Sequence, residues 1–183
     1  MSREPTWHDR DKLTAAMSIA HAVSVDEYLN TSYRPDCEYL EGELLERNVG
    51  EFDHSRLQIS LASYLRAREK QFGILALTAQ RVQVKANRFR VPDITVLLGP
   101  PPAGQIVTTP PFLCIEILSP SDRLTEMQER IDDYINFGVQ YVWVINPRNH
   151  RSSIYRPEGV EEVKNGILTT KNLDIRVPLA EIE

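Results

Sequence analysis

The chain has 183 residues and a formal net charge of −5, with 42% hydrophobic and 26% charged residues. These values are typical of one globular domain whose core is large enough to need no disulfides. The acidic balance gives no overall attraction to nucleic acid, so any DNA binding must depend on a local basic patch. No apolar run is long enough to span a membrane, and the N-terminal segment lacks the apolar centre of a signal peptide.

A reducing, cytoplasmic location is expected from the two cysteines. Cys37 and Cys114 have no metal-binding or redox spacing, and Cys114 lies in an apolar run, as a small buried hydrophobic residue would. We expect residues 1–20 to form a loosely ordered leader and residues 21–183 to form a single domain.

A short helix and a hairpin are the first expected elements. Ser24 and Glu27 form a Ser-x-x-Glu capping box, which predicts a helix start. Residues 37–47 (CEYLEGELLER) place Gly42 between two short mixed segments, which predicts a hairpin or a bent strand pair.

A longer helix is expected from about residue 54 to residue 72. Asp53 is its candidate N-cap, and Gly73 ends it. One apolar stripe runs along it at i, i+4, i+7 and i+8, formed by Leu57, Leu61, Tyr64 and Leu65.

Strands dominate the middle of the chain. Apolar runs predict strands at 74–78, 81–85 and 91–98, with Asn87-Arg88 turning the second into the third. The Pro-rich loop 99–111 cannot join a central sheet. The next run, 112–118, reads as a strand covered on both faces.

A second long helix and another buried strand follow. The helix is expected over about 123–137, with Gly138 as its C-cap. Its stripe consists of Met127, Ile131, Tyr134 and Ile135. Residues 141–145 form the buried strand, and 153–179 suggest two or three short edge strands. A helix between two buried strands predicts a parallel pair, whereas the hairpins predict antiparallel pairs. The expected fold is α/β with α+β character: a mixed sheet flanked by helices.

Two acids stand out in these apolar strands. Glu116 lies inside 112–118, and Asp93 lies inside 91–98. A buried carboxylate is costly unless a cation, a metal or several hydrogen bonds compensate it. If the two strands are neighbours, both acids can point to one spot. Two carboxylates with a few waters form a typical Mg²⁺ or Mn²⁺ site, which suits phosphoryl chemistry.

Arg130 is the candidate cation beside these acids. It lies at the border of the apolar stripe of its helix, from which it can reach the sheet and hold a phosphate. The alternative is an ordinary surface pair with Glu126, four residues earlier.

An ordered set of motifs runs through residues 24–156. It consists of Tyr28, EYLEGE at 38–43, His54, Pro92-Asp93, EILSPS at 116–121, Arg130-x-x-x-Tyr134, Gly138-Val139, Tyr141-x-Trp143 and Asn146-Pro147. This set resembles the Uma-type restriction endonucleases of the PD-(D/E)XK nuclease superfamily. The resemblance implies a restriction-endonuclease-like core that hydrolyses DNA with Mg²⁺ or Mn²⁺, with Asp93 and Glu116 as metal ligands.

One position departs from the pattern of that superfamily. Its lysine normally stands two residues after the glutamate, where this chain has Leu118. In the Uma-type family the lysine lies on the next helix, where this chain has Arg130. Arginine keeps the charge and can clamp a phosphate, but it is a poor proton-transfer group.

Accessory roles are open for several polar residues. Glu38 or Glu43 could supply a third acid, or both could simply be solvated. His54 could bind metal or could serve the helix start and its packing. Tyr134 could pack in the core while its hydroxyl reaches the site. We take Trp143 as a core residue.

A basic stretch precedes Asp93. Its members are Arg81, Lys85, Arg88 and Arg90, with no acid among them. Such a hairpin could guide a phosphate backbone, or it could be a solvated face that protects a sheet edge.

These observations predict a metal-dependent DNA endonuclease that acts as a homodimer, without an organic cofactor or membrane contact. The alternative is a binding or scaffold protein that keeps the nuclease fold and pairs Glu116 directly with Arg130. A glycosidase would need an aromatic sugar platform near the acids, and none is evident. The sequence has no Gly-rich phosphate loop, Gly-x-Ser-x-Gly elbow or Cys/His cluster, which argues against P-loop enzymes, α/β-hydrolases and zinc proteins.

Overall fold

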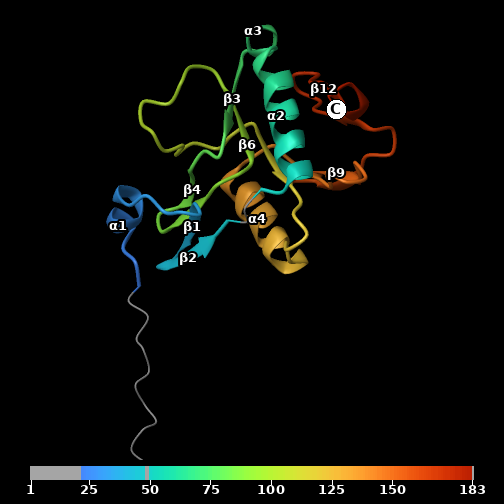
Figure 1. Ribbon diagram of the computed structural model, residues 1–183. Coiled ribbons are helices and arrows are strands. Elements are labelled where there is room, and N and C mark those ends of the chain that lie inside the picture. Colours follow the sequence, from blue (N-terminus) through green and yellow to red (C-terminus); the bar gives the residue numbers. More distant parts are fainter. Residues whose placement is uncertain (1–21, 48–49, 183) are drawn as a thin grey trace, which may run out of the picture.

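The computed structural model describes residues 22–47 and 50–182. The expected leader, residues 1–20, lies outside the described residues. Figure 1 shows α2 and α4 in the centre, α1 with strands β1, β2 and β4 on the left, and the C-terminal hairpin region on the right. Within the described residues, every helix is too short or too polar to cross a membrane.

The larger sheet has six strands in the order β10-β9-β8-β7-β6-β3. The strands are β3 (Ile74–Thr78), β6 (Ile94–Leu98), β7 (Leu113–Ile117), β8 (Tyr141–Ile145), β9 (Ser152–Arg156) and β10 (Gly159–Glu162). β7 and β8 run parallel, and the other neighbouring pairs run antiparallel. The predicted mixed sheet is confirmed, with the parallel pair where a crossover helix required it.

A smaller antiparallel sheet has the order β2-β1-β5-β4. Its strands are β1 (Cys37–Leu40), β2 (Glu43–Glu46), β4 (Val82–Lys85) and β5 (Arg88–Arg90). Near the C-terminus, β11 (Ile167–Thr169) pairs with β12 (Arg176–Pro178), and a 3₁₀ helix, η1 (Leu179–Glu181), follows. The hairpin predicted within residues 37–47 is the β1–β2 pair.

The helices are α1 (Val25–Asn30), α2 (Phe52–Arg66), α3 (Glu69–Phe72) and α4 (Leu124–Phe137). The capping box of α1 is present, because the Ser24 hydroxyl accepts a hydrogen bond from the Glu27 amide at 3.1 Å. Gly138 ends α4 in the left-handed conformation that glycine adopts without strain (φ 109°).

The two long helices cover opposite faces of the larger sheet. The α2 side buries Leu57, Leu61 and Leu65 against Leu113, Ile115 and Ile117 of β7. The α4 side buries Met127, Ile131 and Tyr134 with Cys114. Because side chains alternate along a strand, Glu116 shares the face of Cys114 and points toward α4.

Two predictions of local structure before β6 were wrong. The expected helix 54–72 is two helices, and α2 begins at Phe52 with Glu51, not Asp53, as its N-cap. Residues 66–71 (RAREKQ) carry no large apolar side chain, so no stripe binds that turn to the sheet.

The expected strand 91–98 is also shorter, since β6 begins at Ile94 and Asp93 lies at a bend before it. Pro92 has no amide hydrogen to donate to a ladder, which explains the late start.

The C-terminal region contains more strand than expected. Residues 152–178 form four strands rather than two or three, and β9 lies inside the larger sheet between β8 and β10. Their alternation was too short to separate from loop by pattern alone.

Candidate active site

Asp93 lies at the junction of α2, β6 and β7 and is only 3% exposed. Its Oδ1 accepts a hydrogen bond from Arg47 Nη2 at 2.6 Å. Its Oδ2 accepts one from the Ile117 amide at 2.8 Å and lies 3.2 Å from His54 Nε2. Burial opposes ionisation, but the His54 hydrogen bond and the Arg47 charge together lower the pKa of Asp93.

Glu116 is the buried acid on the α4 side of β7. Its Oε1 accepts a hydrogen bond from the Tyr134 hydroxyl at 2.7 Å. Burial, followed by the charge of Asp93, raises the pKa of Glu116 to about 8. Within residues 22–47 and 50–182, no basic side chain forms an ion pair with it. Among the described residues, the Glu116 carboxyl group therefore has no cationic ion-pair partner.

One small cavity brings the acids together. Its volume is about 20 Å³, which is room for roughly one water-sized species. It is lined by Arg47, His54, Val91, Asp93, Glu116, Ile117, Ser119, Asp122 and Arg130. The structure thus places the three residues proposed as catalytic, Asp93, Glu116 and Arg130, around one space.

Arg130 reaches the cavity from α4 but does not pair as expected. Its Nε lies 3.3 Å from Glu38 Oε2, and its Nη1 lies 3.8 Å from Asp122 Oδ1. The direct Glu116–Arg130 pair of the binding-protein alternative does not form among the described residues. The surface pair with Glu126 does not form either, because Glu126 lies 3.6 Å from Arg123 instead.

The donor set fits a hard divalent cation. Mg²⁺ and Mn²⁺ prefer carboxylate, carbonyl and water oxygens. A carboxylate offers about four lone-pair positions. Protein groups occupy three of these positions on Asp93 and one on Glu116. Over the described ranges, no set of three or more His, Cys, Asp or Glu side chains is arranged to hold a metal. Asp93 and Glu116 are the residues that would hold such a cation.

His54 and Tyr134 both contact the acids, each from a long helix. The hydrogen bond to Asp93 raises the pKa of His54 and favours its charged form. Its other ring nitrogen, Nδ1, is buried without a hydrogen-bond partner in the described structure. Glu43, in contrast, is exposed on β2 and does not line the cavity.

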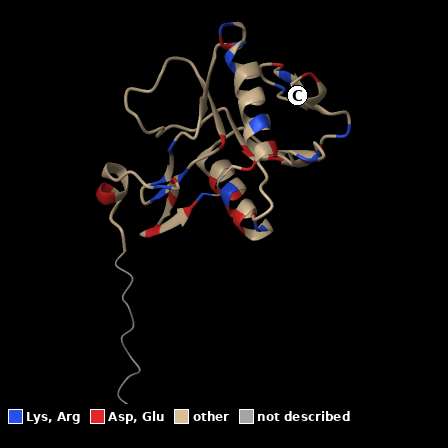
Figure 2. Cartoon of the chain, viewed as in Figure 1, with Lys and Arg blue, Asp and Glu red and all other residues tan. Residues whose placement is uncertain are grey.

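The basic hairpin is largely neutralised by acids. Arg90 is 1% exposed and pairs with Glu38 and Asp133, so it cannot touch DNA directly. Arg88 and Lys85 also pair with Asp133, at 3.0 and 3.6 Å. Figure 2 shows acidic and basic segments interspersed over α4 and this sheet. The sequence could not anticipate this pairing, because the acids lie more than forty residues away.

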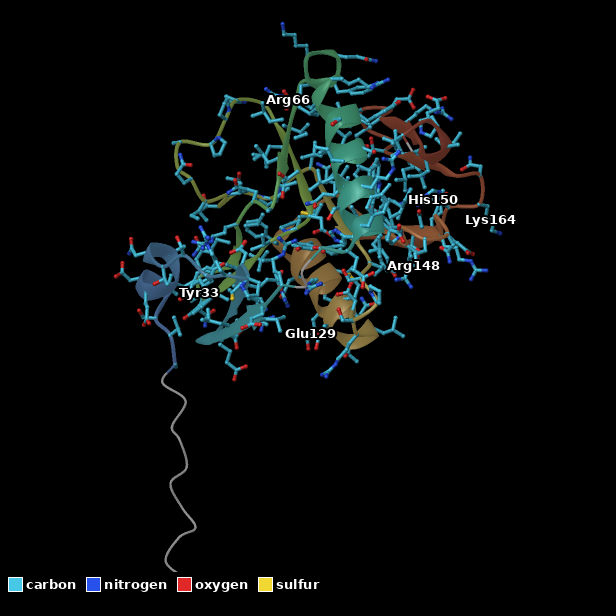
Figure 3. All side chains as sticks on the ribbon, in the orientation of Figure 1. Tyr33, Arg66, Glu129, Arg148, His150 and Lys164 are labelled. Atoms are coloured by element: carbon cyan, nitrogen blue, oxygen red, sulfur yellow. The ribbon has the colours of Figure 1, made fainter. Side chains whose placement is uncertain are left out.

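Sequence reasoning missed three polar neighbours of Asp93 and Arg130. Arg47 follows β2, Asp122 precedes α4, and the Gln58 side chain donates to the Asp93 carbonyl at 2.9 Å. The only signal was indirect, since a buried Asp93 had to find a cation somewhere. Figure 3 labels two charged residues near these helices, Arg148 close to the start of α2 and Glu129 on α4.

Comparisons with known proteins bear on the family and the fold of this chain. A search of curated proteins finds no match. Among solved structures, the chain is similar to the crystal structure of "a putative nuclease belonging to DUF820" from Anabaena variabilis ATCC 29413. The TM-score is 0.74 at 24% identity, over 86% of this chain and 95% of the other, which shows a shared fold. A family model described as "Uma2: Putative restriction endonuclease" matches residues 25–178. Because that match spans most of its length, the chain belongs to the Uma2 family.

Proposed function

We propose that this protein is a metal-dependent DNA endonuclease that hydrolyses phosphodiester bonds with Mg²⁺ or Mn²⁺. The observation that carries the proposal is the convergence of Asp93 and Glu116 on one cavity with Arg130 in its wall. Family membership and the nuclease fold support the reaction class.

Each residue has a role that follows from its contacts. Asp93 and Glu116 hold the cation, which when bound would activate water and offset the charge of the phosphate. Arg130 and Arg47, both at the cavity, bind the non-bridging phosphate oxygens. Tyr134 donates to Glu116 and fixes its orientation.

The hydrolysis step requires one proton acceptor. The water oxygen forms a bond to phosphorus while the ester P–O bond breaks, and the leaving oxygen takes a proton from solvent. Bulk water accepts the proton that the attacking water loses, and Glu116, which stays ionised while it holds the cation, orients that attacking water through a hydrogen bond. Arg130 cannot serve as this acceptor, because guanidinium stays protonated.

The raised pKa of Glu116 links cation binding to pH. With a pKa of about 8, the carboxyl group is mostly protonated at neutral pH when no cation is bound. Binding requires the ionised form, so it releases a proton. The affinity for Mn²⁺ should therefore rise as pH increases toward 8.

Plasmid cleavage tests the proposal. Wild-type protein should nick or linearise DNA with Mg²⁺ or Mn²⁺ and lose this activity in a chelator. Asp93→Ala and Glu116→Ala should lose it, whereas Glu162→Gln, on the exposed strand β10, should keep it. Equal cleavage by wild type and both alanine variants would reject the assignment.

Assembly and location are part of the same proposal. Cutting both strands of a duplex calls for two such sites, so we propose that the protein works as a homodimer. Light scattering on the purified protein should give twice the chain mass of 21.0 kDa. A cytoplasmic location is supported by Cys37 and Cys114, which are both free and buried.

A further inference from the structure

Glu38 contacts Arg130 through the guanidinium Nε, at 3.3 Å. It belongs to β1, is 1% exposed, and is not among the residues that line the cavity. We propose that Glu38 is a positioning residue that holds the Arg130 guanidinium at the cavity wall, and not a third metal ligand. Its importance for catalysis rests on the proposed nuclease function, whereas its contact with Arg130 does not.

Both carboxylate oxygens of Glu38 are already engaged. Oε1 accepts a hydrogen bond from the Val91 amide at 3.1 Å. Oε2 accepts from Arg90 Nη1 at 2.7 Å and from Arg130 Nε at 3.3 Å. These donors are the protein's own and come from the end of β5, from the residue that follows it and from α4. Asp93 is also engaged by three protein groups, so what separates Glu38 from a metal ligand is that Glu38 does not line the cavity.

Four alternating charges close a ring around this contact. Arg130 pairs with Glu38, Glu38 pairs with Arg90, and Arg90 pairs with Asp133 at 2.7 Å. Asp133 and Arg130 are three residues apart on α4, so they lie on one side of the helix. The ring therefore starts and ends on α4 and passes through β1 and β5, which fixes the helix against the smaller sheet.

The ring also explains arginine at position 130. A planar guanidinium can contact Glu38 through Nε and Asp122 through Nη1 while it lines the cavity. A lysine carries its three donors on one nitrogen, so it cannot divide the two contacts between separate nitrogens as the guanidinium does. The arginine that stands in place of the usual lysine is thus held by a buried acid, Glu38, which does not itself line the cavity.

Three measurements separate positioning from metal binding. Calorimetric titration with Mn²⁺ compares wild type, Glu38→Gln and Glu43→Gln, the last being an exposed glutamate on the neighbouring strand. We expect Glu38→Gln to keep the Mn²⁺ affinity within about twofold. A loss of tenfold or more would make Glu38 a metal ligand and overturn the proposal.

The second measurement follows the Arg130 Nε–H group by nitrogen-15 NMR, assigned by its loss in Arg130→Lys. In wild type this proton should exchange with water more slowly than that of the exposed Arg148. Exchange as fast as Arg148 would overturn the proposal, even if Glu38→Gln fails to fold. In folded Glu38→Gln the signal should shift and exchange faster, and an unchanged signal would also overturn it.

The third measurement is cleavage under saturating Mn²⁺. Supporting residues of metal sites typically contribute 10–100-fold, so we expect a kcat lower by about that factor in Glu38→Gln. Glu43→Gln should match wild type, and a Glu38→Gln kcat equal to wild type would overturn the catalytic part. If wild type does not cleave, the proposed function fails, while the NMR and calorimetric results still decide the placement of Arg130.

Discussion

Replacing Glu116 with glutamine removes a buried carboxyl group whose ionisation the fold disfavours. Burial and the neighbouring Asp93 raise its pKa from 4.5 to about 8. At about 1.4 kcal/mol per pKa unit, this difference corresponds to about 5 kcal/mol between the fully protonated and fully ionised limits. Glutamine keeps the shape of the side chain and can still accept a hydrogen bond from Tyr134.

The sign of the effect follows from proton counting. Between pH 4.5 and about 8 the folded chain binds more protons at Glu116 than the unfolded chain does. The stability that this group contributes is therefore complete at low pH and declines as pH rises. Between pH 6 and pH 8 the wild-type protein should lose about 2 kcal/mol for this reason, and Glu116→Gln should not.

Urea denaturation in the presence of a chelator measures this difference. The free energy of unfolding is determined at pH 6 and pH 8 for wild type, Glu116→Gln and the surface control Glu162→Gln. Other titrating groups, His54 included, are present in all three proteins and largely cancel in the comparison. Parallel pH dependence in wild type and Glu116→Gln would refute the reasoning. At pH 8, Mn²⁺ at one hundred times its Kd should stabilise wild type by about 2.7 kcal/mol and the variant much less.

Three further substitutions, with Lys85→Met as a control for one of them, test other contacts by urea denaturation. His54 has a pKa raised by its hydrogen bond to Asp93, so His54→Asn should destabilise most below pH 6.5 and progressively less as pH rises; a constant difference would contradict this. Arg90→Met removes the buried cation that lies closest to both Glu38 and Asp133 and should cost about 3–5 kcal/mol, whereas Lys85→Met, at a 51% exposed side chain, should cost less than about 1 kcal/mol. Equal effects of these two would argue against a buried charge ring. Leu61→Ala, at a fully buried position of α2, should cost about 2–5 kcal/mol, and a neutral result would contradict the packing.

Local sequence patterns correctly predicted the helices and strands that pack a large apolar face into the core. The apolar stripe of α4 recurs at the helical period, and β7 and β8 are short continuous apolar runs, so their positions could be inferred. The break between α2 and α3 and the late start of β6 were missed. The helix breaks where no apolar stripe binds residues 66–71 to the sheet, and β6 starts late because Pro92 cannot donate to a strand ladder.

The residues of the candidate site likewise fall into two groups, those that the sequence revealed and those that only the structure revealed. Glu116 and Asp93 were visible in the sequence because a carboxylate in an apolar run is costly and conspicuous. Their neighbours were not visible, since Arg47 and Asp122 occur in polar segments where charged residues are ordinary. The basic hairpin illustrates the converse, because four clustered cations looked available until α4 supplied Asp133.

The sequence by itself therefore determined that two acids needed cations, that Arg130 lay on the helix crossing between two buried strands, and that the sheet was mixed. Only the tertiary structure decided which cation serves which acid. Arg47 and His54 compensate Asp93, Arg130 turns to Glu38, and Glu116 keeps a tyrosine hydroxyl and a raised pKa. The physical reason is that sequence periodicity fixes the face on which a side chain lies, whereas charge pairing depends on distances between elements far apart in the chain.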